Sequence, residues 1–191
     1  MKLIKDLRAA SAVEFAIMLP FLVLFMLGAT DTAFWLMNKA RLDNTATTVG
    51  NLIASADSLP SGVFPASWCS PNATTINYFA IASTVASPLA VCGSGGATII
   101  SGISNTGHAI IVWQERSGDA GAYPSAIGVA GAVPNLPIGY TVPVGHNVII
   151  TEIYSGISPW NFSSPLLTGG PNFMYSLSVF EPRLAKLVVP Q

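Results

Sequence analysis

Glu14 is the residue whose chemistry most needs an explanation, because it stands at the start of a long apolar run. Residues 15–30 carry no charge, and a basic leader at residues 1–9 precedes them. A carboxylate at membrane depth costs about 2.5–3.5 kcal/mol at the centre of a helix and less near its end. It is tolerated where it pairs with a positive group of its own or of a neighbouring chain. The alternative is an acid at the start of a helix, which the helix dipole favours.

The other residues that could support catalysis form no recognisable motif. His108 and His146 are the histidines, and either could be combined with Asp119 and a serine as a hydrolytic triad. No Gly-x-Ser-x-Gly sequence is present to hold such a serine. The glycine-rich stretch at residues 93–96 is not followed by the lysine of a phosphate-binding loop, so we predict a turn. The sequence therefore predicts no enzyme, no metal site and no cofactor.

Cys69 and Cys92 are the two cysteines, and both follow the apolar run. Two cysteines downstream of an export signal favour a disulfide, which would stabilise the domain by about 3 kcal/mol. Two buried thiols are the alternative. Neither cysteine has a second cysteine or a histidine at ligand spacing, which argues against a metal site.

Residues 10–37 are predicted to form a membrane-spanning helix. The uncharged run is short for a span of about 20 residues, so the helix must include Glu14 and Asp31. The basic residues precede the run, which predicts a cytoplasmic N-terminus and an exported body. A cleavable signal peptide is the alternative, but no small-x-small cleavage site closes the run. Pro20 is expected to kink the helix or to free a backbone carbonyl.

The helix is predicted to continue beyond the membrane to about residue 56. Leu42, Ala46, Val49 and Ile53 recur at helical spacing between polar residues. The sequence Asp-Ser-Leu-Pro at residues 57–60 marks its end. The predicted organisation is a leader at 1–9, a transmembrane and amphipathic helix at 10–57, and an exported domain at 58–191.

The exported domain is predicted to be β-rich, which gives an α+β fold with an antiparallel sheet. Short β-branched runs between glycine, proline and serine predict strands at residues 76–85, 98–103, 109–114, 147–154 and 173–180. The stretch at residues 118–145, rich in Gly, Ala and Pro, is predicted to be a long loop.

Four aromatic residues are predicted to lie in the core of this domain, and a patch that binds sugars or a surface is the alternative. They are Trp68, Trp113, Tyr154 and Trp160.

The low charge of the chain bears on its partners. Charged residues make up 9% of the sequence, which protects a surface only weakly against association and suits a subunit that other subunits cover. Many secreted proteins share this composition. The net charge of −1 leaves no basic face for nucleic acid.

The N-terminal residues resemble the TadE-like family of pilus assembly proteins, minor pilins of tight-adherence (Flp-type) bacterial pili. The resemblance rests on Ala-Ser-Ala-Val-Glu14-Phe15-Ala-Ile-Met-Leu-Pro20 and on the Arg41-Leu-Asp-Asn-Thr-Ala46 register. Residues 148–154 and 181–183 resemble the late strands of the family more weakly.

This resemblance implies a minor pilin or pilus assembly subunit with a pilin-like fold. It implies a single pass through the inner membrane, a cytoplasmic N-terminus and a periplasmic C-terminal domain, with incorporation into the pilus as a further expectation. The implied partners are other minor pilins, the major pilin, the inner-membrane assembly platform and a prepilin peptidase.

A prepilin peptidase would cut between Ala9 and Ala10. The family usually has glycine before the cut, so cleaved and uncleaved forms are both open. The cut would free a positive amine on Ala10, four residues from Glu14, and Glu14 and Phe15 would act in assembly.

Two other readings remain at this point. One is a membrane-anchored exported binding domain without a role in pili. The other is an anchored exported enzyme.

Overall fold

The computed structural model describes residues 7–56, 77–119, 121–156 and 173–183, with the backbone alone at residues 7–11. The chain forms two compact units. Of the described residues, one unit contains residues 7–37, and the other contains residues 38–56, 77–119, 121–156 and 173–183.

The first element is the long helix α1, Leu7–Ala54. It continues through Pro20, and it matches the predicted helix to within a few residues at either end. At its end, the backbone N–H of Arg183 donates to the carbonyl oxygen of Ala54 at 2.8 Å. This bond satisfies one of the carbonyl groups that the last turn of a helix leaves unpaired.

The described part of the strand predicted at residues 76–85, residues 77–85, does not form a strand, and this prediction was wrong. These residues contribute to helix α2, Tyr78–Ala86. The side chain of Asn77 caps α2, because its Oδ1 accepts from the backbone N–H groups of Phe79 and Ala80. Phe79, Ala82 and Ala86 are buried, and their spacing places them on one face of the helix. The cap and this spacing outweigh the local β-propensity.

The other four predicted strands are present and form one antiparallel sheet. They are β1 (Gly96–Asn105), β2 (Ala109–Gly118), β3 (Asn147–Gly156) and β4 (Phe173–Phe180). Their order across the sheet is β2-β1-β3-β4, and every neighbouring pair is antiparallel. The α+β prediction, a long N-terminal helix followed by an antiparallel sheet, is therefore confirmed.

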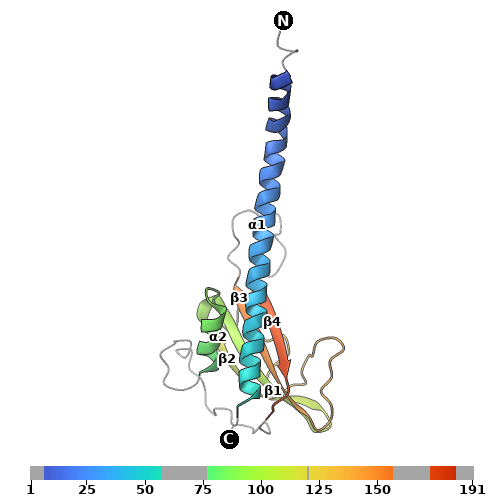
Figure 1. Ribbon diagram of the computed structural model, residues 1–191. Coiled ribbons are helices and arrows are strands. Elements are labelled where there is room, and N and C mark those ends of the chain that lie inside the picture. The colour runs from blue at the N-terminus through green and yellow to red at the C-terminus, as the bar shows by residue number, and fades with distance from the viewer. Residues whose placement is uncertain (1–6, 57–76, 120, 157–172, 184–191) are drawn as a thin grey trace. The chain divides into compact units, whose positions relative to one another are not determined.

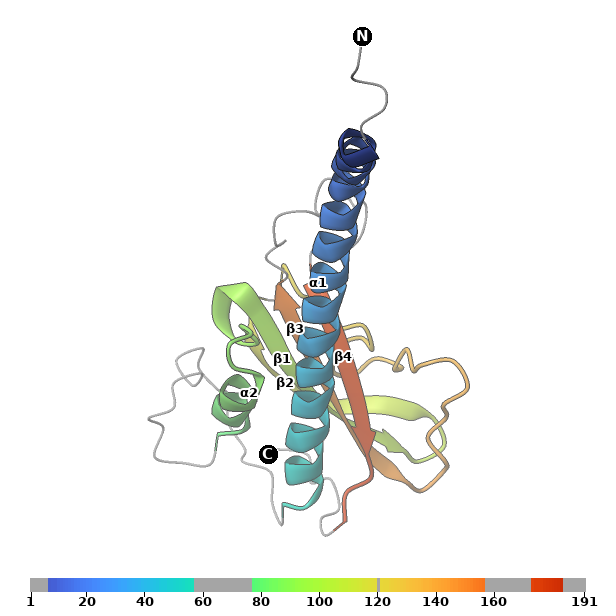
Figure 2. The same ribbon diagram turned by 45° about the horizontal axis from the view of Figure 1, so that its top comes forward.

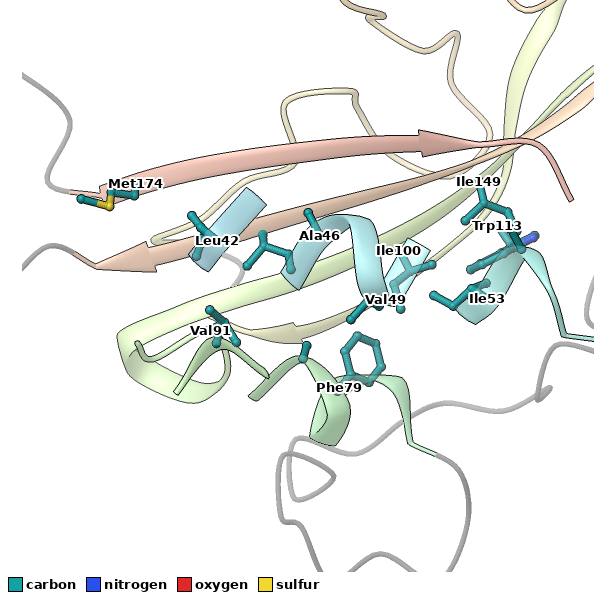
Figure 3. Packing of buried hydrophobic residues seen from close by; sticks show 14 residues of the cluster. Leu42, Ala46, Val49, Ile53, Phe79, Val91, Ile100, Trp113, Ile149 and Met174 are labelled. Atoms are coloured by element: carbon teal, nitrogen blue, oxygen red, sulfur yellow. The ribbon is translucent and has the colours of Figure 1, made fainter. Parts of the chain in front are cut away.

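Helix α2 and residues 42–54 of α1 cover one face of this sheet (Figure 1). Leu42, Ala46, Val49 and Ile53 of α1 are buried there, as their helical spacing predicted. Figure 3 shows these side chains with Phe79 of α2 and with side chains of the strands, including Ile100, Trp113 and Ile149. The amphipathic part of α1 is thus part of the core of the second unit.

The segment between β2 and β3 packs against the opposite face of the sheet (Figure 2). Its described residues form turns and irregular structure without a helix or strand, as predicted for this long loop. Ile127 and Val142 of this segment are buried against Ile103, Ile111 and Ile150. Because both faces of the sheet are covered, nearly every residue of β1 and β3 is buried.

Candidate functional site

The predicted assembly residues Glu14 and Phe15 lie on α1, on a part of the helix that is not packed against described residues. Phe15 is 62% exposed, and residues 12–37 are exposed apart from the half-buried Asp31. Helix α1 contains a stretch long and apolar enough to cross a membrane. An apolar surface of this size needs a lipid or protein environment to cover it. The peptide bond between Ala9 and Ala10 lies within α1, and the side chains of both residues are outside the described part.

Polar side chains connect α1 to strand β4 within the second unit. Lys39 forms an ion pair with Asp43, and Asp43 Oδ1 also accepts from the hydroxyl of Ser176 at 2.6 Å. One turn further, the hydroxyl of Ser178 donates to the carbonyl oxygen of Ala46 at 2.7 Å. Ser176 and Ser178 are buried although they are polar, because α1 supplies their hydrogen-bond acceptors.

Gly50 allows α1 to approach β4 this closely. A Cβ atom at Gly50 would lie 2.7 Å from Phe180 Cδ2 and 2.8 Å from Ser178 Oγ. Both distances are well inside van der Waals contact, so a larger residue would push the helix away from the strand.

The order of these contacts gives the direction of α1 relative to β4. Going along α1 from Lys39 to Gly50, the contacted residues of β4 follow in the same order, from Tyr175 to Phe180. Both stretches are about 16 Å long, at about 1.5 Å per helical residue and about 3.3 Å per strand residue. The helix therefore runs along the strand in the same direction.

Glu152 is a charged residue at the centre of the sheet, and it is 0% exposed. Its Oε1 accepts from the backbone N–H of Ala126 at 2.9 Å and from the hydroxyls of Tyr175 at 3.0 Å and Tyr154 at 3.3 Å. Its Oε2 accepts from the hydroxyl of Ser125 at 2.5 Å. Four donors from two strands and from the long loop therefore satisfy this buried carboxylate.

The two tyrosines of this cluster hold their protons strongly. Burial raises the pKa of Tyr154 and of Tyr175 above the ordinary value, and the negative charge of Glu152 raises each pKa further. Both hydroxyls therefore remain donors to Glu152 at neutral pH. Their rings are also in contact, with centroids 4.8 Å apart and planes tilted by 41°. This cluster attaches residues 125–126 of the loop to the sheet.

Glu152 was not predicted as a site residue from the sequence. It stands as a single carboxylate between apolar β-branched residues at 148–153, and that pattern was the available signal. A charge in a strand that is buried on both faces requires dedicated partners. Three of those partners come from segments distant in sequence, which the pattern cannot reveal.

The residues considered for hydrolysis lie in separate local contacts. The ring of His146 pairs with Glu181 at 2.7 Å, and both side chains are at least half exposed. Asp119 Oδ1 accepts from the backbone N–H groups of Gly121 and Ala122, which closes a turn after β2. Within the described ranges, no hydrogen bond or ion pair joins Asp119 to either histidine.

The structure describes some, but not all, of the residues in the remaining predictions. Trp113 and Tyr154 are buried, as the core interpretation predicted, whereas Trp68 and Trp160 lie outside the described residues. The glycine-rich stretch is a turn of 3-10 helix, Gly93–Gly95, as expected. Cys69 also lies outside the described residues, so its disulfide with Cys92 stays a prediction.

A comparison with known protein families gives a match on the N-terminal helix. Residues 9–50 match the family model described as TadE-like protein. The resemblance predicted from the sequence is therefore confirmed for this segment. No curated protein and no solved structure matches the chain. The TadE-like segment covers the apolar part of α1, with Glu14 and Phe15, and reaches Gly50 at the contact with β4.

Proposed function

We propose that this chain is a minor pilin or assembly subunit of a tight-adherence type IV pilus, which helps to initiate, assemble or tip the filament. The observation that carries the proposal is the TadE-like match over residues 9–50, on a helix whose N-terminal half exposes apolar side chains. The C-terminal half of the same helix is built into the core of the second unit. A subunit of this kind can insert one helix into a membrane or filament while presenting a folded domain.

In this proposal α1 anchors the chain in the inner membrane, with the N-terminus in the cytoplasm and the sheet domain in the periplasm. The basic leader before the apolar helix supports this orientation. The partners are other minor pilins, the major pilin and the inner-membrane assembly platform. Adhesion to surfaces is then a property of the assembled filament, and it requires no binding site on this chain itself.

Glu14 and Phe15 are proposed to contact partner helices during assembly. A carboxylate in apolar surroundings is stabilised most by a positive group that a partner brings, such as a free N-terminal amine. Glu14 lies in the first unit and the sheet lies in the second, so its role is separable from folding of the domain.

The test compares Glu14→Ala with Val13→Ala, a change at the neighbouring exposed residue of the same helix. We expect Glu14→Ala to abolish pilus formation while export and the amount of protein stay at the wild-type level. Val13→Ala should leave pilus formation intact. Wild-type piliation in Glu14→Ala would contradict the assigned role. Mass spectrometry of the native N-terminus separately decides whether a peptidase cuts between Ala9 and Ala10.

A further inference from the structure

Backbone hydrogen bonds from another described segment reach one edge strand of the sheet, β2, but not the other edge strand, β4. At the β2 edge, the loop between β2 and β3 pairs with Ile111, whose carbonyl accepts from Gly131 at 2.7 Å and whose N–H donates to Ala132 at 3.0 Å. At the β4 edge, no backbone hydrogen bond from another described segment reaches the strand. An uncovered edge strand is a template for pairing with another chain.

The sequence of β4 offers none of the usual protections against such pairing. Its eight residues, Phe-Met-Tyr-Ser-Leu-Ser-Val-Phe, include no charge and no proline. Its pairing with β3 runs without a register shift, so no bulge twists the edge away. The edge is therefore regular, uncharged and mostly apolar.

The side chain of Lys39 of α1 donates to the backbone of this strand. Its Nζ donates to the carbonyl oxygen of Tyr175 at 3.0 Å and is held beside the strand by its ion pair with Asp43. In an antiparallel ladder every second residue turns its N–H and C=O away from the neighbouring strand. The bond from Lys39 to Tyr175 indicates that Tyr175, Leu177 and Val179 are the residues that do so.

The order of residues in β4 makes the strand complementary to a second copy of itself. A two-fold axis at Leu177 places Leu177 opposite Leu177, Tyr175 opposite Val179 and Ser176 opposite Ser178. Each of these apolar or hydroxyl pairs is a favourable cross-strand pair, and no like charges face each other within the strand. The three outward-facing residues of each copy can then complete each other's hydrogen bonds.

We propose that the charged side chain of Lys39 prevents β4 from pairing with β4 of a second copy of the chain. An approaching strand must displace the ammonium group from the Tyr175 carbonyl or leave the charge beside a newly buried strand, and both are unfavourable. Because residues 39–50 of α1 run along β4, self-pairing would set these residues of the two copies antiparallel.

The test measures association of the purified full-length chain in detergent, by sedimentation velocity over a range of concentrations. Lys39→Met keeps the length of the side chain and removes its charge and donors. We expect it to dimerise with a dissociation constant at least tenfold below that of the wild type. Lys39→Arg, which keeps a donor and the charge, should behave as the wild type. Arg41→Met is the matched control, because it removes one positive charge from the same helix.

A second substitution identifies the surface involved. In Lys39→Met with Leu177→Lys, two lysines would meet at the two-fold axis, so the dimer should disappear. Independently of whether that variant folds, hydrogen exchange of the Tyr175, Leu177 and Val179 amides should slow with concentration in Lys39→Met. The proposal is overturned if Lys39→Met stays as monomeric as the wild type, if its exchange does not change, or if Arg41→Met associates equally. None of these readouts depends on pilus formation, so they fail or succeed separately from the proposed function.

Discussion

Truncation of Glu152 should destabilise the sheet domain far more than removal of its charge. In Glu152→Ala, the hydroxyls of Tyr154, Tyr175 and Ser125 all lose their bond to the carboxylate. Tyr154 is buried, and a buried donor left without a partner costs about 1–3 kcal/mol. Tyr175 and Ser125 are half-buried, so each is counted only at the net value of a hydrogen bond, about 0.5–1.5 kcal/mol. Ala126 keeps a second acceptor, the hydroxyl oxygen of Tyr154 at 3.2 Å, so we leave it out of the estimate. The expected loss in the free energy of unfolding is therefore about 2–6 kcal/mol.

Glu152→Gln is the matched control for this substitution. Its amide oxygen can accept the bonds that Oε1 accepts now, and its amide nitrogen can donate to Ser125, because a hydroxyl is both donor and acceptor. We expect the free energy of unfolding to stay within about 1.5 kcal/mol of the wild type, which is the net value of one ordinary hydrogen bond.

The measurement is denaturant unfolding of the full-length chain in detergent, followed by tryptophan fluorescence, to which buried Trp113 contributes. Hydrogen exchange of the Ala126 amide should accelerate in Glu152→Ala and change little in Glu152→Gln. If the two variants unfold at the same denaturant concentration, the four hydrogen bonds are not what holds the loop to the sheet. If both match the wild type, the cluster contributes nothing measurable.

Three further predictions concern the same chain. Gly50→Ala should destabilise the domain by about 1–3 kcal/mol through overpacking. Gly28→Ala should be neutral or stabilising by up to about 1 kcal/mol, because nothing lies within 4 Å of its new Cβ atom. Thermal melts of both variants test this difference in stability. Stability should fall as the pH rises above about 10, because the unfolded chain releases the protons of the two tyrosines beside Glu152 while the folded chain retains them. The loss is at most about 1.4 kcal/mol per tyrosine and pH unit, and a melt with a constant midpoint up to pH 11 would refute it. Intact mass after alkylation without reduction should show no modified thiol if Cys69 and Cys92 form a disulfide, and two modified thiols would exclude it.

Much of the local structure follows from the sequence alone. The apolar run and the helical spacing of Leu42, Ala46, Val49 and Ile53 predicted α1, because those patterns depend on residues that are close along the chain. Four β-branched runs predicted the four strands for the same reason. Residues 77–85 were wrongly predicted to lie in a strand, since a short apolar run fits a strand and a buried helix equally well. The Asn77 cap decided for the helix.

The identity of the candidate assembly residues is also a property of the sequence. Glu14 and Phe15 stand out by their place at the start of an apolar run, and their exposure on α1 needs no tertiary contact to arise. The sequence pattern and the family match therefore carry the same information about this segment.

Tertiary structure alone decided how the polar residues of the domain are used. Glu152 is satisfied by Ser125, Ala126 and Tyr175, which lie 23 to 27 residues away along the chain. Lys39 and Tyr175 are separated by 136 residues, yet they meet at the edge of the sheet. Hydrogen bonds act over about 3 Å, so partners at such separations can be found only once the strand order β2-β1-β3-β4 is known. The same order decided that β4 is an edge strand, because the position of a strand in a sheet is not encoded in its own residues.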